Sequence, residues 1–405
     1  MPVIPARRNV VVALALVVLA LGGVVAWLAW NSEGPVRAPI GPALVQPQIV
    51  CSAGTVIVLA ADGSLWGWGD NRHGVLGAGV PDLVARPRRI GAGTNWTAVT
   101  VDYGLGVGLR ADGTLWTWGR DGAGPEGEAR QVNDEHDWRA VGTGHLRVTA
   151  AKTDGTLWAW GPGLADRAGG STYPRQPVQL GTNSNWLAIP AGFYHSFGIQ
   201  QDGSLWVFGA FPLKPGPSRL GADTNWVAVQ NGPRFGMARK ADGSWWVRGP
   251  NVPLMLDLPV TRQPTQLVCL PQTERWEVAA AGGLHVLGLT RNGAMRTLGF
   301  DYRGELGDGT TNSHTTPVEI ASDKSWIAIG AGTFHSVALA ADGSLWTWGQ
   351  RLGESSERSR FIRTLGGWAN RLGLRAAWAD PKSPRFDTKP RCVLRFTTNA
   401  PAHPK

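Results

Sequence analysis

Three histidines are the first residues in this sequence that could form a reactive or metal-binding site. His195, His285 and His335 each stand seven residues before an Asp-Gly or Asn-Gly pair. Imidazole nitrogens are common metal ligands, so three of them brought together could hold a transition-metal ion. Their shared place in a repeating pattern favours a simpler interpretation, in which each imidazole is hydrogen-bonded within its own repeat. We therefore predict no metal site.

Cysteine chemistry and enzyme motifs give no stronger signal. Cys51, Cys269 and Cys392 allow one internal disulfide at most, and their spacing matches no zinc-binding pattern. We expect buried or free thiols. The sequence contains no GxSxG, no HExxH and no phosphate-binding loop. The sequence therefore predicts a protein without a cofactor and without catalytic activity.

The composition favours tight turns with apolar packing, and the charge excludes a nucleic-acid surface on the main body. The chain has 405 residues, of which 55 are Gly and 21 are Trp. Residues 1–350 hold 27 Lys and Arg against 26 Asp and Glu, whereas residues 351–405 hold 12 against 4. A nearly neutral main body does not have the basic patch that binding to nucleic acid requires.

One apolar segment near the start is long enough to cross a membrane. Val10–Trp30 is an uncharged run of 21 residues, and Arg7 and Arg8 precede it. The positive-inside rule then places residues 1–9 in the cytoplasm and the rest of the chain outside it. A cleaved signal peptide is the alternative, although its apolar core is usually shorter. Residues 31–45, which follow, are predicted to be a linker.

Seven repeats with fixed internal spacing are the strongest feature of the sequence. Each contains an Asp-Gly or Asn-Gly pair. A further Gly stands seven residues after the Asp or Asn, and in six repeats a Trp stands 16 residues before the Asp or Asn. The pairs begin at Asp62, Asp112, Asp154, Asp202, Asp242, Asn292 and Asp342. In the first repeat Gln46 stands where the others have Trp. Fixed spacing over repeats of 40–50 residues is typical of propeller blades.

The pattern within one repeat predicts four short antiparallel strands. In Ser336–Trp348, alternating apolar runs flank Asp342-Gly343, which predicts a hairpin with a two-residue type I′ turn and positive φ at both turn residues. Trp326–Ile329 predicts a further strand upstream, and a recurrent Pro-x-x-aliphatic element suits an outer edge strand. We therefore predict an all-β fold, a seven-bladed β-propeller of four-stranded blades over residues 46–350.

The seventh repeat lacks its outer strand, and two segments could supply it. Pro42–Val45 lies just before the first repeat, and Arg391–Phe396 lies in the basic tail of residues 351–405. We favour Pro42–Val45. Four apolar residues of the tail have helical spacing, which is consistent with a basic amphipathic helix, a disordered tail or an out-of-frame extension. They are Phe361, Leu365, Trp368 and Leu372.

These repeats resemble a known family. The stretch Ala331–Gly349 is similar to the repeat of the regulator of chromosome condensation family, and Asp70–Gly79 and Asp301–Gly309 are similar to its downstream loop. The resemblance extends over about residues 46–349 and implies a propeller. The histidine of the family repeat is replaced in four repeats, by Thr55, Leu105, Arg147 and Phe235.

The resemblance also bears on function. Founding eukaryotic members promote nucleotide exchange on a small GTPase, a partner that an exported domain would not meet. Other relatives are secreted bacterial propellers, one of which inhibits β-lactamases by binding them. We therefore expect a bacterial, membrane-anchored member, monomeric and periplasmic or extracellular, that binds a protein; a cell-wall glycan or small ligand is the alternative.

The predicted working surface is the face that carries the loops between first and second strands and the loops after Trp-x-Trp-Gly. Aromatic residues and Arg are enriched in interface hot spots. The first set of loops carries Tyr103, Phe193, Tyr194, Arg234, Phe235 and Phe334. The second set carries Asp70, Arg72, Asp301, Tyr302 and Arg303. In the alternative interpretation, the Phe residues cap the inner strands and are structural.

Overall fold

The computed structural model describes most of the repeat region. The described residues are 35–40, 43–120, 127–144, 147–161, 174–182, 184–188, 196–208, 217–250, 252–258, 266–353 and 386–398. The chain divides into two compact units, one of Met1–Val36 with Ser355–Ser383 and one of Arg37–Glu354 with Pro384–Lys405. The predicted membrane segment and the predicted tail helix lie outside the described residues. None of the described helices is long and apolar enough to span a bilayer.

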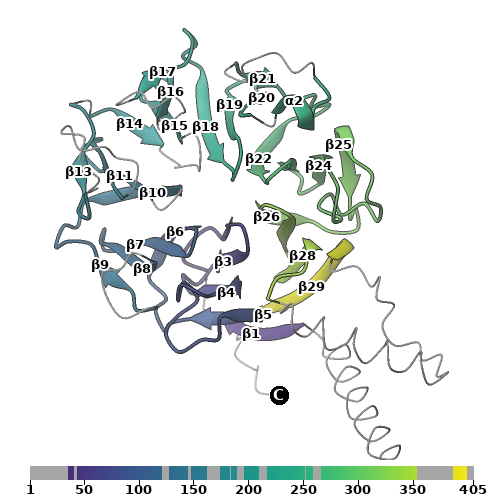
Figure 1. The fold of residues 1–405 in the computed structure, drawn as a ribbon, viewed down its shortest axis with the longest axis horizontal. Helices are drawn as coiled ribbons and strands as arrows, with labels where there is room; N and C mark the ends of the chain where they lie inside the picture. Colours follow the sequence, from purple (N-terminus) through teal and green to yellow (C-terminus); the bar gives the residue numbers. More distant parts are fainter. Residues whose placement is uncertain are drawn as a thin grey trace, which may run out of the picture. The chain divides into compact units, whose positions relative to one another are not determined.

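Seven antiparallel sheets surround a central opening in the second unit, as a seven-bladed propeller requires (Figure 1). Sheet 1 contains β2 Gln48–Cys51, β3 Thr55–Leu59, β4 Leu65–Asp70 and β5 Leu83–Ile90. Sheet 2 contains β6 Trp96–Asp102, β7 Leu105–Arg110, β8 Leu115–Gly119 and β9 Arg130–Gln131. Sheet 3 contains β10 Trp138–Gly144, β11 Arg147–Lys152, β12 Leu157–Trp160 and β13 Val178–Gln179. Sheet 4 contains β14 Trp186–Ala188, β15 Ser196–Gln200, β16 Leu205–Phe208 and β17 Ser218–Arg219. Sheet 5 contains β18 Trp226–Asn231, β19 Gly236–Lys240, β20 Trp245–Arg248 and β21 Val268–Cys269. The short helix α2 Val252–Met255 lies between β20 and β21 in the sequence. Sheet 6 contains β22 Trp276–Ala281, β23 His285–Thr290, β24 Met295–Gly299 and β25 His314–Ile320, and sheet 7 contains β26 Trp326–Ala331, β27 His335–Ala340, β28 Ser344–Gln350, β29 Phe386–Thr398 and β1 Val36–Ile40.

The Asp-Gly hairpins differ from the predicted type I′ turns. In the first sheet, the Gly63 amide donates to the Ala60 carbonyl at 3.0 Å, and the Ala60 amide donates to the Ser64 carbonyl at 2.8 Å. Gly63 has a φ of 77°, whereas Asp62 is not among the residues with positive φ. The loop is therefore a type I turn followed by a glycine bulge. The prediction was wrong because Asp62 uses its side chain, and not a left-handed backbone, to stabilise the turn.

That side chain starts a chain of hydrogen bonds that six sheets share. The Asp62 carboxylate accepts from the amide of Ser64 at 3.0 Å and from its hydroxyl at 2.6 Å. The Ser64 hydroxyl in turn accepts from the indole of Trp66 at 3.0 Å. The same three-residue arrangement, Asp, Ser or Thr, and Trp at alternate positions, recurs from Asp112, Asp154, Asp202, Asp242 and Asp342. The repeated spacing thus fixes the third-strand Trp against its own turn.

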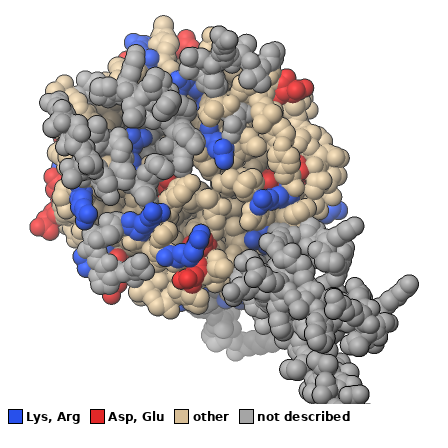
Figure 2. Space-filling view, viewed as in Figure 1, with Lys and Arg blue, Asp and Glu red and all other residues tan. Residues whose placement is uncertain are grey.

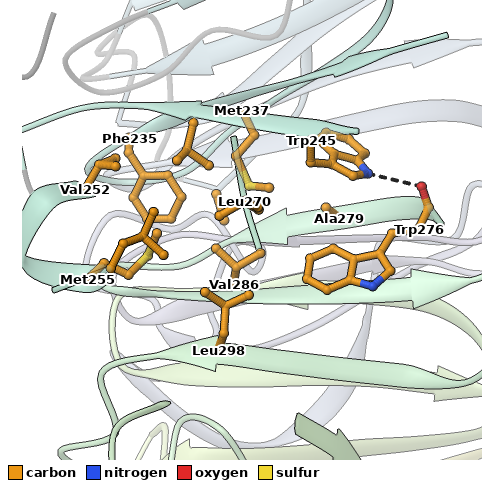
Figure 3. Packing of buried hydrophobic residues seen from close by; sticks show 13 residues of the cluster. Phe235, Met237, Trp245, Val252, Met255, Leu270, Trp276, Ala279, Val286 and Leu298 are labelled. Atoms are coloured by element: carbon orange, nitrogen blue, oxygen red, sulfur yellow. Dashed lines mark hydrogen bonds between the residues drawn. The ribbon is translucent and has the colours of Figure 1, made fainter. Parts of the chain in front are cut away.

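Neighbouring sheets pack through continuous apolar layers. Between sheets 5 and 6, Phe235, Met237 and Trp245 face Trp276 and Val286 (Figure 3). The indole of Trp245 donates to the Trp276 carbonyl at 3.1 Å across this boundary. Both Trp side chains are almost fully buried. Large aromatic side chains therefore hold the blades together, as the high Trp content predicts.

The tail closes the ring, which corrects the preference for Pro42–Val45. β29 is the fourth strand of sheet 7, and β1 pairs outside it as a fifth strand. Residues 43–45 form no strand; the amides of Leu44 and Val45 donate to the carbonyl of Ala61. The competing segment, Arg391–Phe396, lies within β29. β29 pairs along the whole of β28, from Ser344 to Gln350, so the propeller does not end at residue 350.

Phe396 explains how the tail fits this place. In five sheets the amide of the first-strand Trp donates to the carbonyl of the preceding turn glycine, and the amide of Phe396 makes the same bond to Gly343 at 2.9 Å. Its ring packs edge-on against Trp66, with ring centres 5.8 Å apart and planes at 75°. The first-strand Trp residues of other sheets make this contact with their own third-strand Trp. Phe396 therefore replaces the Trp that the first repeat lacks at Gln46.

Candidate functional site

The two faces of the propeller are built differently. We call the face with the loops after first and third strands the loop face, and the face with the Asp-Gly hairpins the turn face. Basic side chains surround the central opening on the face in view in Figure 2, and few acidic ones lie beside them. The turn face has uniform hairpins because the Asp-Gly spacing is fixed, so differences between repeats collect in the long loops.

The loop after β4 carries a surface ion pair. The guanidinium of Arg72 donates to both carboxylate oxygens of Asp70, and Arg72 is well exposed. Burial alone would raise the pKa of Asp70, but the hydrogen bonds from Arg72 lower it below its usual value. Below this pair, the Asn71 side chain accepts from the Leu76 amide at 2.6 Å and donates to the Val80 carbonyl at 3.0 Å. The loop is therefore held by an amide and presents its charges to solvent.

The corresponding loop after β24 presents aromatic surface. Tyr302 is 59% exposed, and its ring stacks on Phe300 with centres 5.2 Å apart. The Arg303 guanidinium lies 4.2 Å from the ring centre of Phe334, and it also donates to the Gln350 side chain. Stacking on an aromatic face orders a guanidinium while leaving it able to bind. This is the best-organised group of the predicted site residues.

Two predicted site residues are buried. Asp301 is 1% exposed and accepts from the Leu306 amide at 3.3 Å, so it supports the loop and does not lie on its surface. Burial, together with neighbouring Glu305, raises its pKa to about 7. Phe235 is 2% exposed within the core between sheets 5 and 6. These two predictions were wrong because the sequence does not distinguish a strand-end or loop-anchoring residue from an exposed one.

The remaining predicted residues are spread around the face. Tyr103 is 42% exposed with a φ of 46°, and its amide donates to the Ser52 hydroxyl at 3.1 Å. Arg234 is exposed in the loop between β18 and β19 of sheet 5. Phe193 and Tyr194 lie outside the described residues. The described members thus form two local contacts, and they do not converge on one point as a catalytic site would require.

Of the three repeat histidines, the two that are described are buried, and neither ring nitrogen of His335 has a hydrogen-bond partner among the described residues, contrary to the prediction. The Nε2 of His285 lies 2.9 Å from the Ser336 hydroxyl, so its partner belongs to the next sheet and not to its own repeat, contrary to the prediction. Burial lowers the pKa of His285 to about 3 and that of His335 to about 4, so both rings are neutral. His195 lies outside the described residues. Across the part of the chain that the structure describes, no cluster of metal-binding side chains occurs.

The first strands surround a central cavity of about 360 Å³. Its lining is polar toward the loop face, with Asp102, Gln230 and Asn231, and aliphatic toward the turn face, with Val278 and Ile327. All three described cysteines are unpaired, and Cys51 is part of this lining. Burial raises the pKa of the Cys51 thiol, so this thiol is poorly nucleophilic.

Sequence reasoning missed the turn-face end of this cavity. In sheets 2 to 7 the pairing of the first two strands shifts directly after the Trp, which leaves one extra residue in a bulge. Three of these six residues are exposed aliphatic side chains, namely Leu187, Val227 and Ile327. An aliphatic residue directly after Trp186, Trp226 and Trp326 was the available signal, but strand alternation alone would not place it on the surface.

Comparison with known families agrees with the repeat structure. A family model described as the regulator of chromosome condensation (RCC1) repeat matches residues 62–104 and 292–339, and a second model of the same repeat matches residues 48–75. These matches include parts of sheets 1, 2, 6 and 7. They contain both long loops described above.

Curated relatives share short stretches of this repeat. The chain is 35% identical over 78 residues to the ultraviolet-B receptor UVR8 of Arabidopsis thaliana, which is 19% of this chain and 18% of that protein. It is 31% identical over 90 residues to the human regulator of chromosome condensation, which is 22% of this chain and 21% of that protein. The matches therefore span about a fifth of these relatives and bear on the repeat alone.

Solved structures share the fold over most of both chains. Prp20p from Saccharomyces cerevisiae superposes with a TM-score of 0.61 at 16% identity, over 80% of this chain and 85% of that one. Human WBSCR16 superposes with a TM-score of 0.63 at 18% identity, over 82% and 93%. At these identities the likeness shows a common fold, and the chemistry of the loops must be argued from this chain.

Proposed function

We propose that this chain, which is built from repeats of the regulator of chromosome condensation family, is a non-catalytic protein-binding propeller displayed outside the cytoplasmic membrane. The observation that carries the proposal is the group on the loop face formed by exposed Tyr302 and by Arg303, which is ordered on Phe334 and Gln350. Aromatic and Arg side chains with little conformational entropy to lose are typical of interface hot spots.

Solved relatives support a protein as the partner. The structure of Prp20p was described with its binding to Gsp1p and histones, and another structure contains Kap60 bound to yeast RCC1 (Prp20). Those partners belong to those proteins. A shared fold with different loops is expected to bind a different protein, and the proposed export excludes a nuclear partner.

The location rests on the sequence. The apolar run of residues 10–30 behind Arg7 and Arg8 supports a single helix with the N-terminus inside. Alkaline phosphatase fused after residue 398 should be active, and a cytoplasmic reporter at the same place should be silent. The reverse pattern would contradict the orientation. N-terminal sequencing of the mature protein separates an anchor from a cleaved signal.

The binding surface is tested with two exposed tyrosines. Tyr103→Ala with Tyr302→Ala should reduce capture of the envelope partner at least about tenfold, because hot-spot aromatic residues typically contribute about 2 kcal/mol or more. Val178→Ala is the matched control, since Val178 is 48% exposed on the outer strand β13. Equal capture by both variants would show that the loop face is not the binding surface.

A glycan is the second candidate, because the polar end of the central cavity favours it. Asp102, Gln230 and Asn231 provide hydrogen-bonding groups there, and Tyr103 follows Asp102 at the rim. An aromatic ring beside such groups is suited to stacking on a sugar. Titration with soluble cell-wall fragments distinguishes the candidates: saturable binding that Gln230→Ala removes, without protein capture, would favour the glycan.

A further inference from the structure

The turn face carries a ring of bulge residues around the central cavity. In each of sheets 2 to 7 the residue after the first-strand Trp is extra in the pairing with the second strand. A bulge turns its residue out of the regular alternation and aims the side chain differently. The six bulge residues are Thr97, Arg139, Leu187, Val227, Glu277 and Ile327. Sheet 1 has no such shift.

Four consecutive sheets place exposed aliphatic side chains on this ring. Leu187 is 48%, Val227 50% and Ile327 47% exposed, and Val278, next to the bulge in sheet 6, is 40% exposed. We call these four residues the aliphatic arc. Single exposed aliphatic residues are common on protein surfaces, but four of them in consecutive sheets, two of which line a cavity, suit a binding site better than chance exposure.

The polar members of the ring already have partners. The guanidinium of Arg139 donates to the carbonyl of Trp186, and the Glu277 carboxylate accepts from Arg239 at 2.8 Å. The Thr97 hydroxyl donates to a backbone carbonyl of the neighbouring strand at 3.3 Å. The polar bulge residues therefore stabilise the ring, whereas the aliphatic ones keep apolar surface in water.

Two Lys side chains near the arc are paired with carboxylates. Lys240 pairs with Asp223 at 2.8 Å, and Lys324 pairs with Asp323 at 3.0 Å. These pairs weaken the attraction of either Lys for an anionic partner, so the favourable term that we consider is burial of the arc. The cavity, whose lining includes Val278 and Ile327, adds a hollow whose turn-face end is aliphatic.

We propose that the turn face binds an uncharged aliphatic segment that projects from another protein, with its tip in this mouth of the cavity. A bilayer does not fit, because Asp202 and Asp242 lie on the same face and hydrogen bonds from Ser204 and Ser244 lower their pKa values, so hydrocarbon would meet ionised carboxylates. A second copy does not fit either, because its turn face is hollow at the same place. This surface is opposite the loop face and is independent of the function proposed above.

The test begins with site-specific cross-linking in the native membrane. The photoreactive amino acid p-benzoylphenylalanine replaces Val227 in the full-length chain, or Val178 as a control of similar exposure on β13. A partner protein that cross-links to the chain substituted at position 227, and not to the chain substituted at position 178, is identified by mass spectrometry and purified. Its dissociation constant is then measured with unmodified full-length chain in detergent.

The variant Leu187→Ser, Val227→Ser and Ile327→Ser should weaken this binding by about tenfold or more, since three half-exposed aliphatic groups are lost from the interface. Val178→Ser should change it less than about twofold. Raising salt from about 0.05 M to 0.5 M should also change it little, because burial and not charge drives binding. Unchanged thermal unfolding of the triple variant shows that it is folded.

Five results would overturn the proposal, and the first four concern the partner protein. They are the absence of an adduct specific to position 227, an adduct with a second copy of the chain, equal loss with Val178→Ser, and a strong salt dependence. Competition by phosphatidylglycerol vesicles for the purified partner would assign the arc to a membrane surface and would also refute it.

Discussion

The loops after β4 and β24 follow the same plan but differ at the residue that anchors them. In the first, Asn71 holds the loop with its amide; in the second, Asp301 occupies the corresponding place and accepts from Leu306 as Asn71 does from Leu76. An amide offers a donor and an acceptor at every pH, whereas a carboxyl offers a donor only when it is protonated. The carboxyl of Asp301, where the first loop has an amide, therefore makes the stability of the second loop depend on pH.

The two loops also differ in the segments of the chain that they contact. Gly309 in the second loop donates its amide to the carbonyl of Thr388 in β29 at 2.8 Å, and a side chain at Gly304 would collide with the backbone of Asp387. The first loop instead meets Gly127 of the following loop, which lies against its Ala78 backbone. The exposed aromatic group of the loop face thus rests on a strand contributed by the tail.

Removal of the tail should have the largest effect on this comparison. Truncation after residue 353 removes β29, which pairs with all of β28, and Phe396, which packs on Trp66. We expect loss of a single cooperative unfolding transition, because an open edge and a broken ring remain. Hydrogen exchange should rise in the loop after β24 and stay low in the loop after β4. Truncation after residue 398, which keeps β29, is the control, and an unchanged melting curve for the shorter chain would refute the role of the tail.

The next largest effect concerns a tryptophan that fastens each loop to the following sheet. The Trp118 indole donates to the Val75 carbonyl and the Trp348 indole donates to the Glu305 carbonyl, each at 2.8 Å. Both Trp residues are almost fully buried. Trp118→Ala and Trp348→Ala should each lower the free energy of unfolding by about 3–5 kcal/mol.

Phenylalanine variants sharpen that test. Trp118→Phe and Trp348→Phe keep most of the apolar volume and lose the bond, so each should cost about 1–3 kcal/mol by leaving a buried carbonyl less satisfied. Urea unfolding measures all four values. A cost confined to one of the two sites would show that the loops are fastened differently.

The sequence predicted the blades well and the closure and the surface less well. Repeat spacing gave the strands because Asp62 and its equivalents fix the hairpins locally. Ring closure depends on whether residues near 44 or near 394 reach the free edge of β28, and no local pattern decides that. The burial of Asp301 and Phe235 depends on how a loop folds over the next sheet, which a repeat alignment does not reveal.

Asp301→Asn should remove a pH dependence of stability. Burial raises the pKa of Asp301 to about 7, above an unfolded value of about 3.9, so its contribution is complete below pH about 4 and is lost as pH rises through about 7. Glu305, Asp308 and Arg303 are the charged neighbours that influence this titration. The variant should therefore gain stability over the wild type at pH about 8.5 relative to pH about 5, as urea midpoints would show.

Asn71→Asp provides the mirror experiment in the other loop. It should lose stability as pH rises over the same interval, because an ionised carboxylate cannot donate to the Val80 carbonyl as the amide does. Parallel pH profiles for the wild type and both variants would contradict the difference between the loops.

The smallest effect separates the exposed parts of the two loops. Arg72→Ala should change the free energy of unfolding by less than about 1 kcal/mol, because Arg72 is 67% exposed and surface ion pairs contribute little. Arg303→Ala should cost somewhat more, since it removes both the contact with Phe334 at 4.2 Å and the hydrogen bond to Gln350. Arg303→Lys keeps the charge but not the planar stacking, so it should resemble Arg303→Ala more than the wild type.

High salt should abolish the cost of Arg72→Ala and leave most of the cost of Arg303→Ala, because screening weakens the exposed pair and not the stacked contact. Equal salt responses of the two variants would mean that Arg303 acts as a surface charge and that the loop face is not ordered by stacking.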